Sequence, residues 1–250
     1  MKKEFHTVPV AEAFVSGDEC PFCNLHRQTE QRAIRHFAGP AATYMAPECR
    51  AITNDTGFCP THTKKLYDYG NTLGVALMLQ THCETLLLQL QEQTENYEIP
   101  QKRGLFQKKK PESTSPQWVR LQQQVNRCAI CDQIADNMQR HFRVFFDLLQ
   151  EEEFRQMVAS SKGFCLGHFA QLLQEADTHL PQKQAQWFYP TVQRVMAENL
   201  QRVKADLDRL IIKYDYRNAD LPWENAKDSL QRMVQKLSGI YPADPPYRKD

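Results

Sequence analysis

Glycine is scarce in this sequence, with 9 among 250 residues, about half of its usual frequency. Runs in which β-branched and polar residues alternate, as in strands, are also scarce, whereas stretches rich in Gln, Leu, Glu and Arg are long. These four residues favour helices. We therefore expect an all-α protein, long enough to bury a hydrophobic core without disulfides.

A marked excess of charge of either sign is missing as well. The chain has 31 basic and 30 acidic side chains, so its net charge gives no general affinity for nucleic acids. The most apolar stretch, Leu73–Leu90, contains polar side chains such as His82 and Glu84, which argues against a membrane span. No apolar run of signal-peptide length follows the basic N-terminus. We therefore expect a cytoplasmic protein.

Eight cysteines are present, and six of them occur in a duplicated pattern. Cytoplasmic thiols stay reduced, so closely spaced cysteines there indicate metal binding or redox chemistry rather than structural disulfides. Each half of the chain has a CxxC pair followed by a Gly-Phe-Cys-x-x-His motif, whose cysteine lies 36 residues further on in the first half and 34 in the second. The two halves therefore resemble tandem repeats.

The ligand types and their spacing predict two metal sites, each with three cysteines and one histidine. A CxxC pair can point both sulfurs at one ion, and a Cys-x-x-His pair places two ligands on the first turn of a helix. This is the ligand set of a closed structural zinc site. We expect one zinc ion in each half, the first held by Cys20, Cys23, Cys59 and His62 and the second by Cys128, Cys131, Cys165 and His168. The sequence also allows an exchange, in which the CxxC pair of one half meets the CxxH pair of the other.

Three other uses of these residues stay open. The CxxC pairs could oxidise and release the metal, as in a thiol-based redox or metal sensor. Three cysteines and one histidine could also hold an iron–sulfur cluster. Finally, the thiols and imidazoles could pack in a helical core without any ion.

The pattern along the chain predicts four segments. Residues 1–98 form an N-terminal helical repeat with one long helix at about residues 61–97. Residues 99–117 contain three prolines and five basic residues, which predicts a flexible basic linker. The C-terminal helical repeat is expected at residues 118–238, with helices at about 184–213 and 223–237, and an extended tail at residues 239–250.

Several further residues are interpreted as structural. Cys83 lies on the apolar face of the helix expected at 61–97, and Cys49 has no equivalent in the second half, so both are expected to be buried. His36 and His141 each precede a phenylalanine and are expected to be half-buried packing residues. The basic cluster at residues 108–110 is interpreted as a solvated part of the linker.

The segment 213–228 is rich in both aromatic and polar residues. In one interpretation, Tyr216, Arg217 and Trp223 form a recognition surface, since loops of this composition often carry binding. The interpretation that we favour is a connection between two helices, in which Pro222 starts the second helix.

No catalytic arrangement is recognisable in the sequence. A nucleophile with its base and orienting group, a phosphate-binding loop and a pair of catalytic carboxylates are all missing. We therefore expect a zinc-binding module that binds a partner or regulates, rather than an enzyme. The partner could be a protein or a nucleic acid.

The duplicated CxxC and GFCxxH motifs, together with the segment KYDYRNADLPWENAKDSLQR, resemble an uncharacterised bacterial family known as domain of unknown function 6062. The resemblance covers nearly the whole chain, and all eight expected ligands fit without substitution. It implies a bacterial protein with the same two-repeat architecture. The family has no established activity, so the resemblance implies no mechanism.

Overall fold

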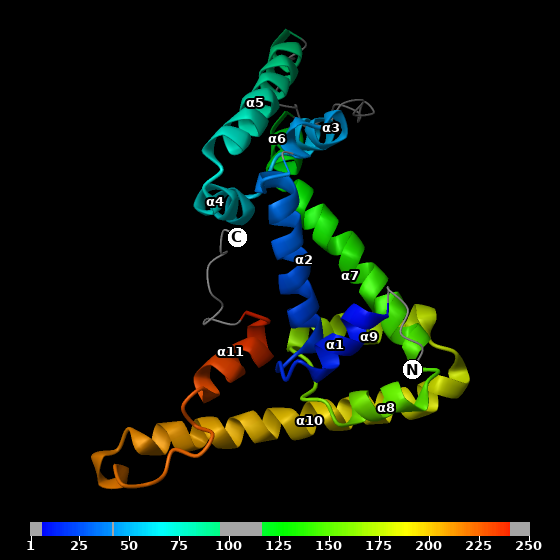
Figure 1. Cartoon of the computed structure of the whole chain (residues 1–250), viewed down its shortest axis with the longest axis vertical. Helices are drawn as coiled ribbons and strands as arrows, with labels where there is room; N and C mark the ends of the chain where they lie inside the picture. The colour runs from blue at the N-terminus through cyan, green and yellow to red at the C-terminus, as the bar shows by residue number, and fades with distance from the viewer. Residues whose placement is uncertain (1–6, 42, 96–116, 241–250) are drawn as a thin grey trace, which may run out of the picture. The chain divides into compact units, whose positions relative to one another are not determined.

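Residues 7–41, 43–95 and 117–240 are described by a computed structural model, and the regular structure in these ranges is entirely helical (Figure 1). The predicted all-α class is confirmed. The described residues form two compact units, of which the first combines residues 7–29 with 136–240 and the second contains the described residues between 30 and 135. Each unit therefore draws on both halves of the sequence. The division into repeats at residues 1–98 and 118–238 stays a prediction.

The first unit has a core of packed phenylalanine rings. Its helices are α1 (Val8–Val15), the beginning of α2 (Pro21–Ala38), most of α7 (Ala129–Leu148), α8 (Glu152–Ala159), α9 (Leu166–His179), α10 (Gln182–Lys213), the short η2 (Tyr216–Asn218) and α11 (Ser229–Ser238). The rings of Phe22 and Phe142 stack with their centres 4.3 Å apart. Phe22 also lies 5.9 Å from the fully buried Phe164. Because Phe22 lies within the first CxxC pair and Phe164 directly precedes Cys165, this core brings two ligand segments together.

The second unit has a smaller core with fewer aromatic rings. It contains the end of α2, the short η1 (Thr43–Met45), α3 (Pro47–Thr56), α4 (Pro60–Tyr69), α5 (Thr72–Glu95), α6 (Gln117–Val125) and the beginning of α7. Phe37 packs edge to face against Phe58, with ring centres 5.5 Å apart, and Leu66 and Met78 are fully buried. The buried residues of α5 all lie in its first third, so the rest of this helix is largely solvent-exposed.

The single helix expected at residues 61–97 is wrong, because the chain breaks between α4 and α5. Gly70 ends α4 in the left-handed conformation, with a φ of 84°, and its N–H donates to the carbonyl of Tyr67. Asn71 then caps α5 by accepting a hydrogen bond from the N–H of Gly74 at 3.1 Å. The apolar periodicity continues across the break, which is why it does not reveal the break.

The other predicted segments fare differently. The helix at 184–213 is confirmed by α10, whereas the helix expected from Trp223 begins later, at Ser229, because turns occupy the residues before it. Residues 99–116 and 241–250, which include most of the predicted linker and tail, lie outside the described residues.

Cys49 is buried as expected, but Cys83 is exposed, because it lies beyond the buried first third of α5. None of the described helices is long and apolar enough to cross a membrane.

Candidate metal centres

Each CxxC pair lies at the start of a long helix. Cys20 directly precedes α2 and Cys23 lies in its first turn, and Cys128 and Cys131 occupy the same positions at α7. Residues three apart lie on the same side of a helical turn, so both sulfurs of a pair face one point. At α7, the N–H of Cys131 also donates to the sulfur of Cys128 at 3.5 Å.

Each CxxH pair also lies at the start of a helix. Cys59 is the N-terminal cap of α4 and Cys165 that of α9, and each histidine follows in the first turn. The N–H of His168 donates to the sulfur of Cys165 at 3.4 Å. The unpaired N–H groups of a helix start favour negative charge, which stabilises the thiolate that a metal requires.

A glycine with positive φ precedes each of these cysteines by two residues. Its φ is 62° at Gly57 and 77° at Gly163, a region that L side chains rarely adopt. At Gly57, a Cβ atom would in addition lie 2.5 Å from Nε2 of His82. The glycine of the GFCxxH motif is therefore required by the turn into the helix.

The first unit brings Cys20, Cys23, Cys165 and His168 together in what we name the α2/α9 centre. The sulfurs of Cys23 and Cys165 are 3.5 Å apart. Nδ1 of His168 lies 3.6 Å from the sulfur of Cys20, 3.4 Å from that of Cys23 and 3.2 Å from that of Cys165. All three cysteines are buried.

The second unit brings Cys59, His62, Cys128 and Cys131 together in what we name the α4/α7 centre. The sulfurs of Cys59 and Cys131 are 3.8 Å apart. Nδ1 of His62 lies 3.3 Å from each of the three sulfurs. Here only His62 and Cys128 are buried, while Cys59 is half-buried and Cys131 is exposed.

The expected grouping of ligands within each half is wrong, and the exchanged grouping is the one found. The CxxC pair of α2 does not meet the CxxH pair of α4, and the CxxC pair of α7 does not meet the CxxH pair of α9. The reason is the path of α2 and α7, whose 18 and 20 residues span about 27 and 30 Å. Each of these helices begins in one unit and ends in the other. The CxxH pair that follows therefore lies in the opposite unit from the CxxC pair at the helix start.

The spacing of the ligand atoms fits a single four-coordinate ion. Around a tetrahedral zinc ion, with bonds of about 2.3 Å to sulfur and about 2.0–2.1 Å to nitrogen, two sulfurs lie about 3.8 Å apart and sulfur and nitrogen about 3.6 Å apart. The sulfurs of Cys23 and Cys165 are 3.5 Å apart and those of Cys59 and Cys131 are 3.8 Å apart, and all ligand atoms of a group lie within 4.8 Å of one another. Both groups could therefore hold a metal ion.

The thiols of one group oppose one another's ionisation. In the α2/α9 centre, hydrogen bonds to Cys165 and Cys20, together with burial, raise the pKa of Cys23 far above its usual range. The hydrogen bonds from Cys20 and Cys23 lower the pKa of Cys165. One thiolate is thus favoured and a second is disfavoured beside it. A bound cation would remove this opposition by attracting all three thiolates.

In the α4/α7 centre, too, the pKa of one thiol is lowered and that of another is raised. Burial, followed by the hydrogen bond to Cys128, raises the pKa of Cys131 to about 12. At Cys128 the effect of burial is outweighed by hydrogen bonds, first of all the one from His62, which lower the pKa to about 6. In both centres a bound cation would therefore favour the thiolate form of the cysteine whose pKa is raised.

Glu30 and Lys65 orient the histidine of the α4/α7 centre. Nε2 of His62 lies 3.0 Å from Oε1 of Glu30, and Nζ of Lys65 lies 2.6 Å from the same oxygen. Burial lowers the pKa of His62, but the hydrogen bonds to Cys128 and Glu30 outweigh it and raise the pKa to about 10. A carboxylate on the outer nitrogen of a histidine ligand fixes the orientation of the ring. Glu30 therefore aims Nδ1 of His62 at the three sulfurs.

The α2/α9 centre is supported differently, by α11. Lys236 is 0% exposed, and its Nζ donates to the backbone carbonyls of Glu19, at 2.5 Å, and of Lys162. Glu19 directly precedes Cys20, and Lys162 directly precedes the GFCxxH motif, so one ammonium group joins both ligand segments. Gly239 ends α11 against the sulfurs, because a Cβ atom there would lie 3.5 Å from the sulfur of Cys165.

Other histidines lie outside the two groups. His36 is exposed, contrary to expectation, because it lies on the outer side of α2, and His141 is half-buried as expected. Sequence reasoning missed Glu30 and Lys236. Neither belongs to a recognisable motif, since a glutamate and a lysine on amphipathic helices are ordinarily exposed side chains.

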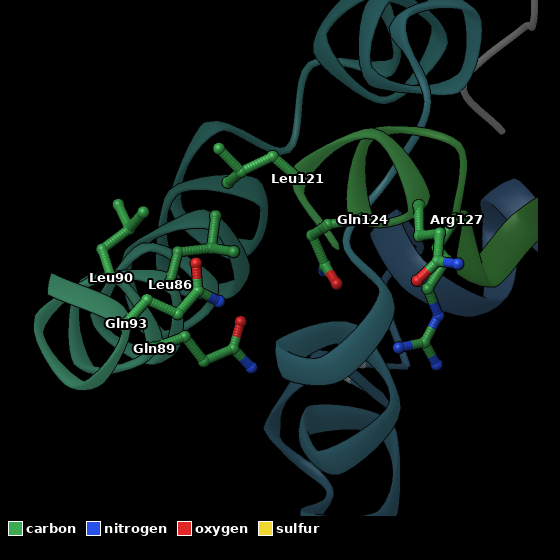
Figure 2. Close-up of a pocket in the computed structure, with 8 residues that line it drawn as sticks. Leu86, Gln89, Leu90, Gln93, Leu121, Gln124 and Arg127 are labelled. Carbon is green, nitrogen blue, oxygen red and sulfur yellow. The ribbon is translucent and has the colours of Figure 1, made fainter. Parts of the chain in front are cut away.

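A separate cavity of about 340 Å³ lies in the second unit, between α5 and the end of α6 (Figure 2). Figure 2 shows Leu86, Gln89, Leu90 and Gln93 of α5 on one side and Leu121, Gln124 and Arg127 on the other. Arg127 is already paired with Asp55, to which it donates at 3.0 Å. The lining thus offers amide and aliphatic groups, with no cysteine, histidine or carboxylate among them.

Comparison with known proteins agrees with the resemblance seen in the sequence. No curated protein and no solved structure matches the chain. The family described as "Family of unknown function (DUF6062)" matches residues 1–244, which is nearly the whole chain. The protein therefore belongs to this family.

Proposed function

We propose that this protein binds two zinc ions, one in each compact unit, and that the ions hold the ligand-bearing segments in place. The observation that carries the proposal is the gathering of three sulfurs and one imidazole nitrogen within 4.8 Å in both units. Four protein ligands fill a tetrahedral coordination shell and leave no position for water or substrate. This donor set supports structural rather than catalytic ions.

The short distances between sulfurs favour a single ion over an iron–sulfur cluster. The cysteines of a cluster bind different iron atoms, so their sulfurs lie farther apart than two ligands of one ion. The separations of 3.5 Å in the α2/α9 centre and 3.8 Å in the α4/α7 centre match one shared ion. Zinc is the usual occupant of such a closed set of cysteine and histidine ligands.

Each ion would join parts of the chain that are far apart in sequence. Cys23 and Cys165 are separated by 142 residues, and Cys59 and Cys131 by 72. Holding such distant segments together costs chain entropy. Structural zinc supplies about 10–16 kcal/mol in zinc-finger peptides, which is comparable to the stability of a whole domain. Loss of an ion is therefore expected to unfold the unit that contains it.

The connection between α10 and α11 supports a role as a binding or regulatory module. It displays Tyr214 and Tyr216, which are 85% and 86% exposed. Lys213 holds the connection in place, because its Nζ donates to the carbonyl of Leu221 at 2.8 Å and lies 4.9 Å from the ring centre of Trp223. Fixed loops that display aromatic side chains are typical of protein-binding surfaces. We therefore propose a protein partner rather than a nucleic acid.

Elemental analysis of the purified protein tests the proposed ions. Two zinc equivalents per chain are expected, and one equivalent each for Cys23→Ser and Cys128→Ser. The control is Cys83→Ser, which changes an exposed cysteine outside both centres and should leave two equivalents. A metal-free protein, or iron accompanied by inorganic sulfide, would contradict the proposal.

A further inference from the structure

The two centres differ in the solvent exposure of their cysteines. The three cysteines of the α2/α9 centre are at most 2% exposed. In the α4/α7 centre, Cys128 is buried, but Cys59 is half-buried and Cys131 is exposed. A reagent dissolved in water therefore reaches sulfur in the α4/α7 centre first.

Protection of the α2/α9 centre comes from parts of the chain outside the ligand motifs. The ammonium group of Lys236 joins the two ligand segments through hydrogen bonds to their backbone carbonyls, and the end of α11 lies against the sulfurs. The α4/α7 centre instead adjoins an open surface hollow, which is lined by Phe58, Pro60, Thr63, Lys64, Tyr67 and Val125. Phe58 and Pro60 are the direct neighbours of Cys59, so the hollow reaches the edge of this centre.

The two cysteines of the α4/α7 centre that are not fully buried are also neighbours. The sulfurs of Cys59 and Cys131 are 3.8 Å apart, and they come from the starts of two different helices. A disulfide has a sulfur–sulfur bond of about 2.0 Å. An approach of less than 2 Å, which is about the difference between these two distances, would therefore bring them within bonding distance.

We propose that Cys131 and Cys59 form an oxidisable pair, which a peroxide converts into a disulfide with release of the ion from the α4/α7 centre. The proposal rests on the proposed function, because an ion must be bound before it can be released. The α2/α9 centre keeps its ion under the same conditions. The protein thus has one permanent ion and one that responds to oxidants.

The chemistry takes two steps. The thiolate of Cys131 attacks one oxygen of hydrogen peroxide, so that an S–O bond forms, the O–O bond breaks and hydroxide leaves. The thiolate of Cys59 then attacks the resulting sulfenic sulfur, so that the S–S bond forms and a second hydroxide leaves. The two thiolates lose two electrons, which the peroxide accepts. The ion keeps only Cys128 and His62 and dissociates as a divalent cation.

The test treats the two-zinc protein with a small excess of hydrogen peroxide in the presence of a colorimetric zinc chelator. We expect one equivalent of zinc to be released, at a rate at least tenfold above that with chelator alone. Mass spectrometry of unreduced peptides should find a disulfide between Cys59 and Cys131. Release of both ions together, release of none, or a disulfide confined to the α2/α9 cysteines would overturn the proposal.

A second variant separates loss of the thiol from loss of the ion. Cys131→His keeps four potential ligands, because histidine also binds zinc, and the substituted position is exposed. This variant should hold two ions and release neither with peroxide, whereas Cys83→Ser should behave like the unchanged protein. Peroxide-dependent release from Cys131→His would overturn the proposal. Purification of the unchanged protein without metal would instead overturn the proposed function.

Discussion

The α2/α9 and α4/α7 centres have the same set of ligands, three cysteines and one histidine, yet their surroundings differ. The α2/α9 centre lies against a phenylalanine core and the end of α11. The α4/α7 centre lies at the surface of a smaller core and is supported by a carboxylate on its histidine. The short motifs therefore determine the ligands, whereas segments distant in sequence determine the access of solvent and the orientation of the histidine.

The largest effect is expected from pairs of substitutions that test how the ligands are grouped. The double variant Cys23→Ser/Cys165→Ser damages one centre and should keep one zinc equivalent. The double variant Cys23→Ser/Cys59→Ser damages both and should keep none. The reason is that a centre without one or two of its four ligands loses most of its free energy of zinc binding, which is about 10–16 kcal/mol in zinc-finger peptides. Elemental analysis measures both values.

These two variants also give an outcome that would contradict the structure. Grouping within each half would reverse the two results, since Cys23 and Cys59 would then share a single ion. Each variant serves as the control for the other, because both lose two cysteines and both include Cys23→Ser.

A smaller effect is expected from Glu30, the carboxylate that contacts His62 in the α4/α7 centre. Glu30→Gln should weaken zinc binding there by about 10- to 100-fold, because the charged partner of His62 is lost. The ion of the α2/α9 centre is the internal reference and should keep its affinity. Competition with a chromophoric chelator measures both affinities. Equal weakening of both ions would indicate general destabilisation instead of a local effect.

The smallest expected effect is a difference between the glycines that precede Cys59 and Cys165. Both have positive φ, so alanine at either position should cost about 1–3 kcal/mol of stability. Gly57→Ala should exceed Gly163→Ala by roughly 1 kcal/mol, because its Cβ atom would also clash with the ring of His82. At Gly163 the nearest neighbour of a Cβ atom lies 3.4 Å away. Denaturant unfolding of the zinc-bound variants measures the difference, and an equal loss of unfolding free energy in both variants would contradict this prediction.

The sequence predicts what local chemistry determines. Ligand types, the CxxC and CxxH spacing and the helical class all follow from short stretches of chain. Four apolar residues of α7 recur at the helical period in the sequence, and all four, Ile134, Met138, Phe142 and Phe145, are buried. The helix period alone is sufficient to place these side chains on one face.

The grouping of the ligands could not be predicted because it depends on where α2 and α7 end. Periodicity gives the length of these helices but not the unit that each end reaches. Glu30 and Lys236 were missed for a related reason, since their partners lie 32 and 217 residues away in sequence. The position of Cys83 on an apolar stripe suggested burial, but burial needs a packing partner, and the structure leaves the side chain exposed.

The exchange of ligand pairs has a consequence for the growing chain on the ribosome. Cys23 is synthesised 145 residues before His168, which corresponds to about 7–30 s at the usual rate of translation. During that time the early thiolates have no completed set of ligands, and the α4/α7 centre is the first whose four ligands have all been made. The ligands of the α4/α7 centre are therefore complete before those of the α2/α9 centre, and α11, which lies against the sulfurs of the latter, is synthesised after both.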